Sequence, residues 1–204
     1  MKTDQRKYIE YVRKFAVTGR HHIWLGGSFL RGNPTQFSDV DISAYMGIDA
    51  LRTFIYSYGE PIYISYTTNP EGIIIVIYED GVAVDLEVIE SVDVTSDGYF
   101  HEESIKDHVF RRNSNVCKEL CLRHDAPYQT ARLFHRSLIK YLGGKRDIGV
   151  SVANEIAAYL NDGSSVTESD YRNGMRSLIE DYHAKYPLDA EYRKLCLELI
   201  ECSQ

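Results

Sequence analysis

Apolar and polar residues alternate along the first part of the chain with two different periods. Between residues 4 and 17 the apolar positions recur at the helical period, which predicts an opening amphipathic helix. The short apolar segment His22–Leu25 ends in Gly26-Gly27-Ser28, a pattern typical of a strand followed by a tight turn and a polar loop. Residues 37–46 then alternate into a second predicted strand.

A helix and a hairpin are expected next. Asp49 is placed to cap the helix, and two extended segments, 62–67 and 73–78, follow it. The second extended segment meets residues 81–89 across an Asp80-Gly81 pair. Because Asp-Gly between β-rich segments favours a tight hairpin turn, these two strands are expected to pair.

The pattern changes near residue 100, where β-branched runs disappear and helical periodicity takes over. We therefore predict an α+β fold with a mixed sheet and flanking helices in an N-terminal domain, residues 1–100. A C-terminal helical bundle is expected in residues 101–204. The predicted bundle helices cover residues 128–142, 149–160, 168–185 and 189–201.

Composition limits the partners of this chain. No apolar run is long enough for a membrane span, and the first residues lack the apolar stretch of a secretory signal, so a cytoplasmic protein is expected. The four cysteines then fit reduced thiols. With 23 basic and 30 acidic residues the formal charge is -7, which disfavours binding to a long nucleic acid and favours a small, even cationic, ligand.

Three acidic residues are the candidates for chemistry. Asp39 and Asp41 share one face of the second predicted strand, since side chains two apart in a strand point the same way. Asp85 lies on the polar face of the hairpin strand and is expected to reach the same place. Clustered carboxylates are tolerable where a cation compensates them, and their hard oxygen atoms suit Mg²⁺ completed by a substrate phosphate.

The glycine turn complements these acids. Without a side chain at Gly27, backbone N–H groups there can approach a triphosphate closely. Taken alone, a Gly-Gly-Ser segment is usually a turn, and an Asp-x-Asp segment is usually a solvated strand edge. Their order, spacing and strand context together favour a nucleotide site.

This combination resembles the polymerase β-like nucleotidyltransferase superfamily. The resembling segments are Gly27-Ser28-Phe29-Leu30-Arg31-Gly32, Ser38-Asp39-Val40-Asp41-Ile42 and Val84-Asp85-Leu86. Within that superfamily the chain is most similar to small bacterial antibiotic nucleotidyltransferases, particularly aminoglycoside 6-adenylyltransferases. Asn33-Pro34 and Tyr78-Glu79-Asp80-Gly81 add to this likeness, whereas the helical half shows no match and the chain is shorter.

The resemblance implies roles for single residues. Gly27 and Ser28 would bind the β- and γ-phosphates, and Arg31 would approach the triphosphate. Asp39, Asp41 and Asp85 would bind two Mg²⁺ ions, with Asp85 as third carboxylate or general base. The implied reaction transfers a nucleoside monophosphate from a nucleoside triphosphate, expected to be ATP, to a hydroxyl of a small acceptor, with release of pyrophosphate. An aminoglycoside acceptor would make the enzyme an antibiotic-resistance factor.

Two other functions stay open at this point. One is a nucleotidyltransferase of the toxin–antitoxin type that acts on tRNA or a protein, and the other is a nucleotide-binding module without catalysis. Retention of all three acids disfavours the second. Glu87 is a reserve carboxylate, although an exposed strand acid is its more ordinary reading, and His21-His22 is given no role. Basic residues also recur along one face of a predicted helix, at Arg132, Arg136 and Lys140. A solvated helix face is the preferred interpretation, and a triphosphate clamp is the alternative.

Overall fold

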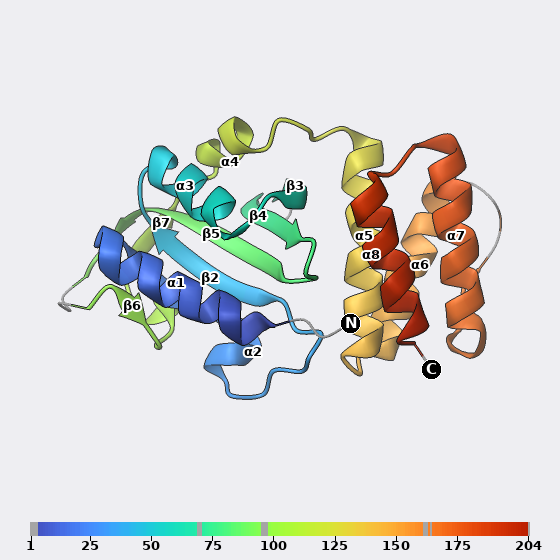
Figure 1. Ribbon diagram of the computed structural model, residues 1–204, viewed down its shortest axis with the longest axis horizontal. Coiled ribbons are helices and arrows are strands. Elements are labelled where there is room, and N and C mark those ends of the chain that lie inside the picture. Colours follow the sequence, from blue (N-terminus) through green and yellow to red (C-terminus); the bar gives the residue numbers. More distant parts are fainter. Residues whose placement is uncertain (1–3, 69–70, 95–97, 161–162, 164, 204) are drawn as a thin grey trace. The chain divides into compact units, whose positions relative to one another are not determined.

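The chain forms two compact units, Lys2–Arg123 and His124–Gln204. The computed structural model (Figure 1) describes residues 4–68, 71–94, 98–160, 163 and 165–203. The first unit contains a mixed sheet, and the second contains helices, so the predicted α+β class is confirmed. None of the helices formed by the described residues combines the length and apolar character that a membrane span requires.

The first unit is built on a seven-stranded sheet of order β3-β4-β5-β2-β1-β6, with β7 beside β5. Its strands are β1 (His22–Leu25), β2 (Val40–Tyr45), β3 (Pro61–Thr68), β4 (Glu71–Tyr78), β5 (Ala83–Val92), β6 (Phe100–His101) and β7 (Phe110–Arg112). Its helices are α1 (Gln5–Gly19), α2 (Gly27–Leu30), α3 (Ile48–Tyr58), the 3-10 helix η1 (Ile105–Asp107) and α4 (Asn115–Leu120). The central pair β2–β5 is parallel, whereas β1–β2, β3–β4 and β4–β5 are antiparallel.

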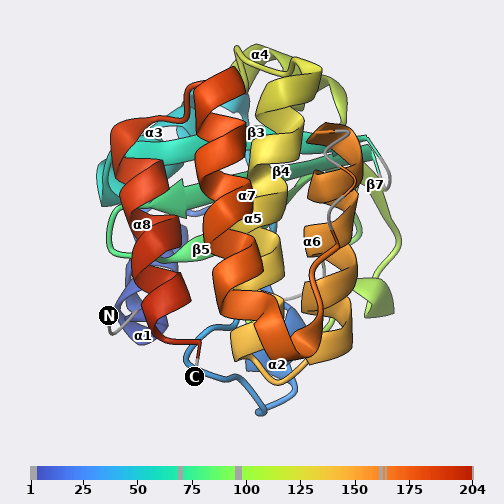
Figure 2. The same ribbon diagram turned by 90° about the vertical axis from the view of Figure 1, so that its right-hand side faces the viewer.

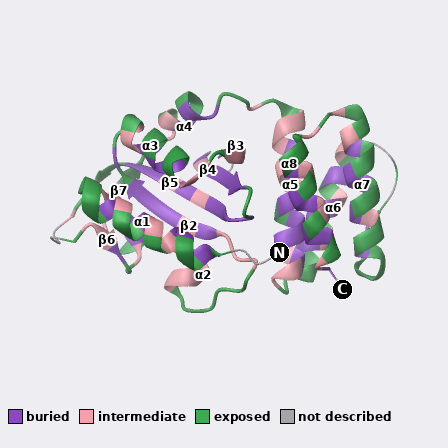
Figure 3. Ribbon diagram, in the orientation of Figure 1, coloured by how far each residue is buried: buried purple, intermediate pink, exposed green. Residues whose placement is uncertain are grey.

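One face of this sheet is the hydrophobic core. Alternate residues of β2 and β5 point to it, and all are at most 2% exposed; they are Val40, Ile42, Ala44, Val84, Leu86 and Val88. They pack with apolar residues of α1, α3 and α4. The burial colours of Figure 3 show these central strands as the most buried part of the unit. The period of two therefore leaves Asp41, Asp85 and Glu87 on the opposite face, as the sequence predicts.

The second unit is a group of four long helices, coloured from yellow to red in Figure 2. They are α5 (Ala126–Leu142), α6 (Arg146–Leu160), α7 (Tyr171–Lys185, preceded by the 3-10 helix η2, Glu168–Asp170) and α8 (Ala190–Glu201). Side chains of Asp125 and Asp189 cap α5 and α8 by accepting backbone N–H hydrogen bonds. Buried residues such as Phe134, Ile156 and Leu199 form the apolar faces. The four predicted helices are confirmed.

Three local expectations differ from the structure. Residues 100–112 are not purely helical, since β6 pairs with β1 and β7 pairs with β5, so this stretch belongs to the sheet unit. The Gly-Gly-Ser turn continues into the short helix α2. Gly47, and not Asp49, is the N-cap of α3; Asp49 lies in the first helical turn with an exposed side chain.

Candidate active site

Asp41 and Asp85 lie side by side on the polar face of the sheet. They are direct partners in the parallel β2–β5 register. Since neighbouring strands are about 4.8 Å apart and paired side chains share a face, the register brings the two carboxylates together. Both line a cavity of about 540 Å³ that lies wholly in the first unit.

The glycine turn is packed directly against Asp41. The Gly26 N–H donates a hydrogen bond of 2.8 Å to the Asp41 carbonyl, which joins the end of β1 to β2. At Gly27 the backbone is left-handed, with a φ of 57°, and a Cβ built there would lie 1.6 Å from Asp41 Oδ2. The carboxylate thus occupies the space that any other side chain would need. The turn and the acid form one structural feature, which explains why the motif contains glycine at this position.

Ser28 and Arg31 follow on α2. Ser28 Oγ is buried and has no hydrogen-bond partner among the described residues. Native proteins rarely leave such a hydroxyl unpaired, so this atom is suited to meet a ligand beside Gly27. Arg31 is exposed and lines the cavity with Gly27. The structure therefore brings Gly27, Arg31, Asp41 and Asp85 to one cavity, with Ser28 adjacent in the chain.

Asp39 is the residue directly before β2 begins. It does not line the cavity, and within the described part of the chain no three His, Cys, Asp or Glu side chains converge as a metal site. The loop before it is held by Gln5, a buried residue of α1 whose Nε2 donates to the carbonyls of Gln36 (2.7 Å) and Ser38 (3.2 Å). Gln5 was missed in the sequence because an amide on an amphipathic helix carries no periodic signal.

Glu87 is a member of the cavity and not an exposed strand acid. Its side chain is only 13% exposed. Ser43 Oγ donates a hydrogen bond of 2.8 Å to Glu87 Oε2, and Arg112 Nε on β7 donates to Oε1. All three residues line the cavity beyond the Asp41–Asp85 pair. A hydroxyl and a guanidinium therefore fix and neutralise this carboxylate.

Apolar groups enclose the remaining space. Trp24 of β1 is the strand neighbour of Ser43, and Ile73 of β4 is the strand neighbour of Glu87. Ile105 of η1 completes this apolar lining. Trp24 is 1% exposed and its ring stacks on His101 with centroids 4.5 Å apart. Such walls lower the local dielectric constant, which strengthens electrostatic interactions between the carboxylates and a ligand.

The comparisons with known proteins give only distant likenesses. No family model and no curated protein matches this chain. Among solved structures it is similar to the CD-NTase CdnG of Bradyrhizobium diazoefficiens in complex with GTP, with 11% identity, a TM-score of 0.31, and coverage of 99% of this chain and 92% of that one. It is also similar to the CdnE cyclic dinucleotide synthase of Elizabethkingia meningoseptica with GTP and Apcpp, with 12% identity, a TM-score of 0.29, and coverage of 99% and 91%. At these identities and TM-scores the likeness shows neither a family nor a function of this chain.

Proposed function

We propose that the first unit binds a nucleoside triphosphate and transfers its nucleoside monophosphate to a hydroxyl acceptor. One observation carries the proposal: the Asp41 carboxylate fills the side-chain space of Gly27 and stands beside Asp85 in one cavity. Metal-assisted nucleotidyl transfer needs backbone N–H groups that phosphates can reach and carboxylates that bind the metal. The glycine turn supplies the first, and the paired carboxylates supply the second. A solvated strand edge would not need a glycine packed on its acid.

The carboxylates fit a divalent cation. Mg²⁺ is usually held in proteins by one or two carboxylates, with water and substrate phosphates completing its shell. Asp41 and Asp85 supply such a pair. We assign Asp39, the residue directly before β2, as the further ligand of a two-ion site. When bound, Mg²⁺ supplies charge neutralisation at the leaving pyrophosphate and makes the acceptor hydroxyl more acidic.

The residues of this chain then have separate tasks. Gly27 and Ser28 bind the β- and γ-phosphates, and Arg31 adds a positive charge to this end of the triphosphate. The acceptor oxygen attacks the α-phosphorus in line, the new P–O bond forms, and the bond to the β-phosphate oxygen breaks, so pyrophosphate leaves with the electron pair. Asp85 accepts the proton of the acceptor hydroxyl.

The proposal also specifies the donor and the acceptor of the reaction. We assign ATP as donor and a small hydroxyl-bearing molecule of the aminoglycoside type as acceptor, which makes the protein a cytoplasmic antibiotic-resistance enzyme. The net charge of -7 supports a cationic acceptor over tRNA. Mass spectrometry of an aminoglycoside and of tRNA, each incubated with the four triphosphates and Mg²⁺, tests this choice; transfer to tRNA alone would replace the small acceptor.

Triphosphate binding is expected to depend on divalent metal. Without a cation, the negative charges of Asp41 and Asp85 would face the negative charges of the phosphates. The affinity for α,β-methylene-ATP, measured by calorimetry, should therefore fall by about tenfold or more when Mg²⁺ is replaced by EDTA. Adenosine, which lacks phosphates, serves as the control ligand and should bind equally in the two conditions. Equal affinity of the analogue with and without Mg²⁺ would remove the metal from the proposal.

A further inference from the structure

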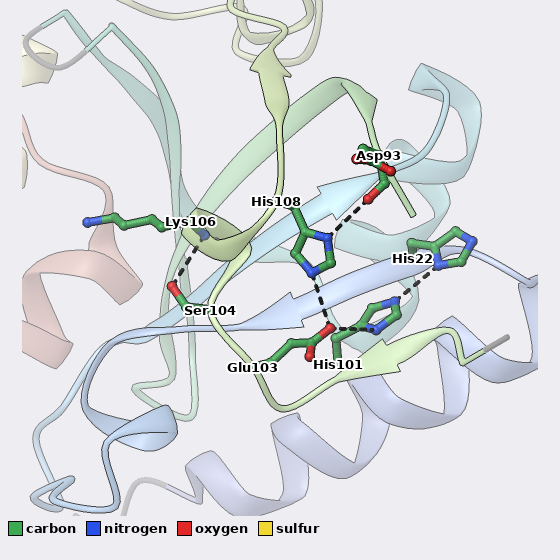
Figure 4. Close-up of polar contacts among 7 residues, drawn as sticks. All are labelled: His22, Asp93, His101, Glu103, Ser104, Lys106 and His108. Atoms are coloured by element: carbon green, nitrogen blue, oxygen red, sulfur yellow. Dashed lines mark hydrogen bonds and ion pairs between the residues drawn. The ribbon is translucent and has the colours of Figure 1, made fainter. Parts of the chain in front are cut away.

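A short segment between β6 and β7 forms one wall of the cavity. We call residues 102–108 the strap; it contains η1 and lines the cavity through Ser104, Ile105 and Lys106. Lys106 is exposed and makes no ion pair with a described residue. Figure 4 shows its side chain extending away from the histidines, while its backbone N–H donates to Ser104 Oγ at 3.3 Å. An unpaired ammonium group in the wall of a triphosphate cavity is placed to meet a phosphate.

Glu103 links the end of the strap to β6, because its carboxylate contacts two histidines. Glu103 Oε1 lies 3.2 Å from Nε2 of His108, at the end of the strap, and 3.7 Å from Nδ1 of His101, on β6 (Figure 4). His101 is 5% exposed and stacks on Trp24 in the cavity wall. The strap therefore holds its position through one carboxylate and two imidazole rings, which we call the clasp.

The geometry of His108 requires a charged ring. Its Nδ1 lies 3.0 Å from the Asp93 carbonyl oxygen and its Nε2 lies 3.2 Å from the Glu103 carboxylate. Both partners can only accept hydrogen bonds, and a neutral imidazole carries a single N–H. Both contacts are satisfied together only by the doubly protonated imidazolium.

The surroundings of His108 favour that form. The hydrogen bond to the Asp93 carbonyl is the main cause that raises the pKa of His108 above its ordinary value; burial opposes it, and the Glu103 and Asp93 carboxylates act with the carbonyl. The Trp24 ring packs edge-on against it, with centroids 5.7 Å apart. His101 is the nearby group that would oppose the charge if it were protonated.

Burial and the neighbouring His22 ring both lower the pKa of His101, which favours its neutral form. His101 Nε2 and His22 Nδ1 are 3.0 Å apart, a contact in which one ring donates and the other accepts. Burial lowers the pKa of both rings. The positive charge of the clasp therefore belongs to His108.

We propose that the His108 imidazolium is a positioning group that holds the strap closed through Glu103, so that Lys106 contacts a phosphate of the bound nucleotide. The inference rests on the proposed function, because the triphosphate is the anion that Lys106 meets. It adds a pH dependence that the carboxylates alone do not predict. Since the pKa is raised in the folded protein, both hydrogen bonds are complete below pH ~6.5 and one is lost as the pH rises through the raised value.

The test measures the affinity for α,β-methylene-ATP with Mg²⁺ between about pH 6 and about pH 8.5, a range that begins near the ordinary pKa of histidine and extends above it. In the wild-type protein the affinity should fall with rising pH by about 3- to 10-fold more than in His108→Gln, the loss expected for one hydrogen bond. Protonation of the ligand itself is common to both proteins and cancels in this comparison. Lys106→Gln should bind weakly throughout and lose the extra pH dependence, whereas Lys118→Gln, an exposed lysine of α4 outside the cavity, should behave as wild type.

The outcomes separate the two proposals. If the wild-type protein binds no analogue at any pH, the proposed function fails. If it binds with the same pH profile as His108→Gln, or if Lys106→Gln binds as wild type, the clasp has no role in binding and the proposed function stands. The ¹⁵N chemical shifts of the His108 ring, measured by NMR in the wild-type protein, test the protonation state without a variant. Two protonated ring nitrogens are expected near pH 6. A single neutral tautomer at that pH would overturn the inference.

Discussion

Asp41→Asn is expected to abolish nucleotidyl transfer while leaving the fold intact. The amide has nearly the shape of the carboxylate, so it can occupy the same space beside Gly27. It lacks the negative charge that holds a divalent cation next to Asp85. Loss of a charged ligand from such a site removes several kcal/mol of transition-state stabilisation, so the rate of pyrophosphate release should fall by about 10²- to 10⁴-fold.

Stability is expected to change in the opposite direction. Removing one of two adjacent carboxylates relieves like-charge repulsion, so the melting temperature of Asp41→Asn in EDTA should equal or exceed that of the wild type. Asp49→Asn is a matched control, since it makes the same chemical change at a 97% exposed side chain. Because Asp49 lies in the first turn of α3 and is not its cap, this control should lose only a few tenths of a kcal/mol and keep full activity. If Asp41→Asn melts well below the wild type yet transfers normally once folded, Asp41 is structural and the reaction occurs elsewhere.

The strand pattern predicted the polar face of the site correctly because burial enforces a period of two. Val40, Ile42, Val84 and Leu86 are buried in the core, so the intervening acids must point the other way. The Asp80-Gly81 hairpin was also predictable, and Gly81 has the positive φ, 82°, that such a turn uses. Asp41 and Asp85 lie side by side because of the β2–β5 register. The sequence indicates that the two acids are close, but it does not determine this register.

The cavity wall could not be predicted in the same way. β6 and β7 contain two and three residues, too few to show alternation, so the sequence pattern assigns this stretch to the start of the helical half. The sequence predicts no role for His22, because its neighbour His21 is expected to point to the other side of the strand. Its partner, His101, is 79 positions distant and is brought close only by the parallel pairing of β1 with β6. The sequence predicts an exposed Glu87, because its partner Arg112 lies on β7, a strand too short to be predicted.

Gly27→Ala is expected to lower the rate of nucleotidyl transfer strongly, although it adds only one methyl group. The added Cβ would lie 1.6 Å from Asp41 Oδ2 and 2.5 Å from its Cγ, so either the acid or the turn must move. A displacement of about 1 Å at a reacting centre costs about 10²-fold in rate, and a loss of this size or more is expected in transfer assays. Binding of α,β-methylene-ATP should weaken too, since the phosphates lie against the same turn.

Gly32→Ala separates this clash from backbone strain. Gly32 also has a positive φ, 72°, but a Cβ there would meet nothing within 4 Å. Both variants carry the cost of a left-handed alanine, about 1–2 kcal/mol, so both should melt at a lower temperature than the wild type. Only Gly27→Ala adds the collision with Asp41, and therefore only this variant should lose transfer measured well below its melting temperature. Equal activities of the two variants would show that the contact between Gly27 and Asp41 does not position the catalytic carboxylate.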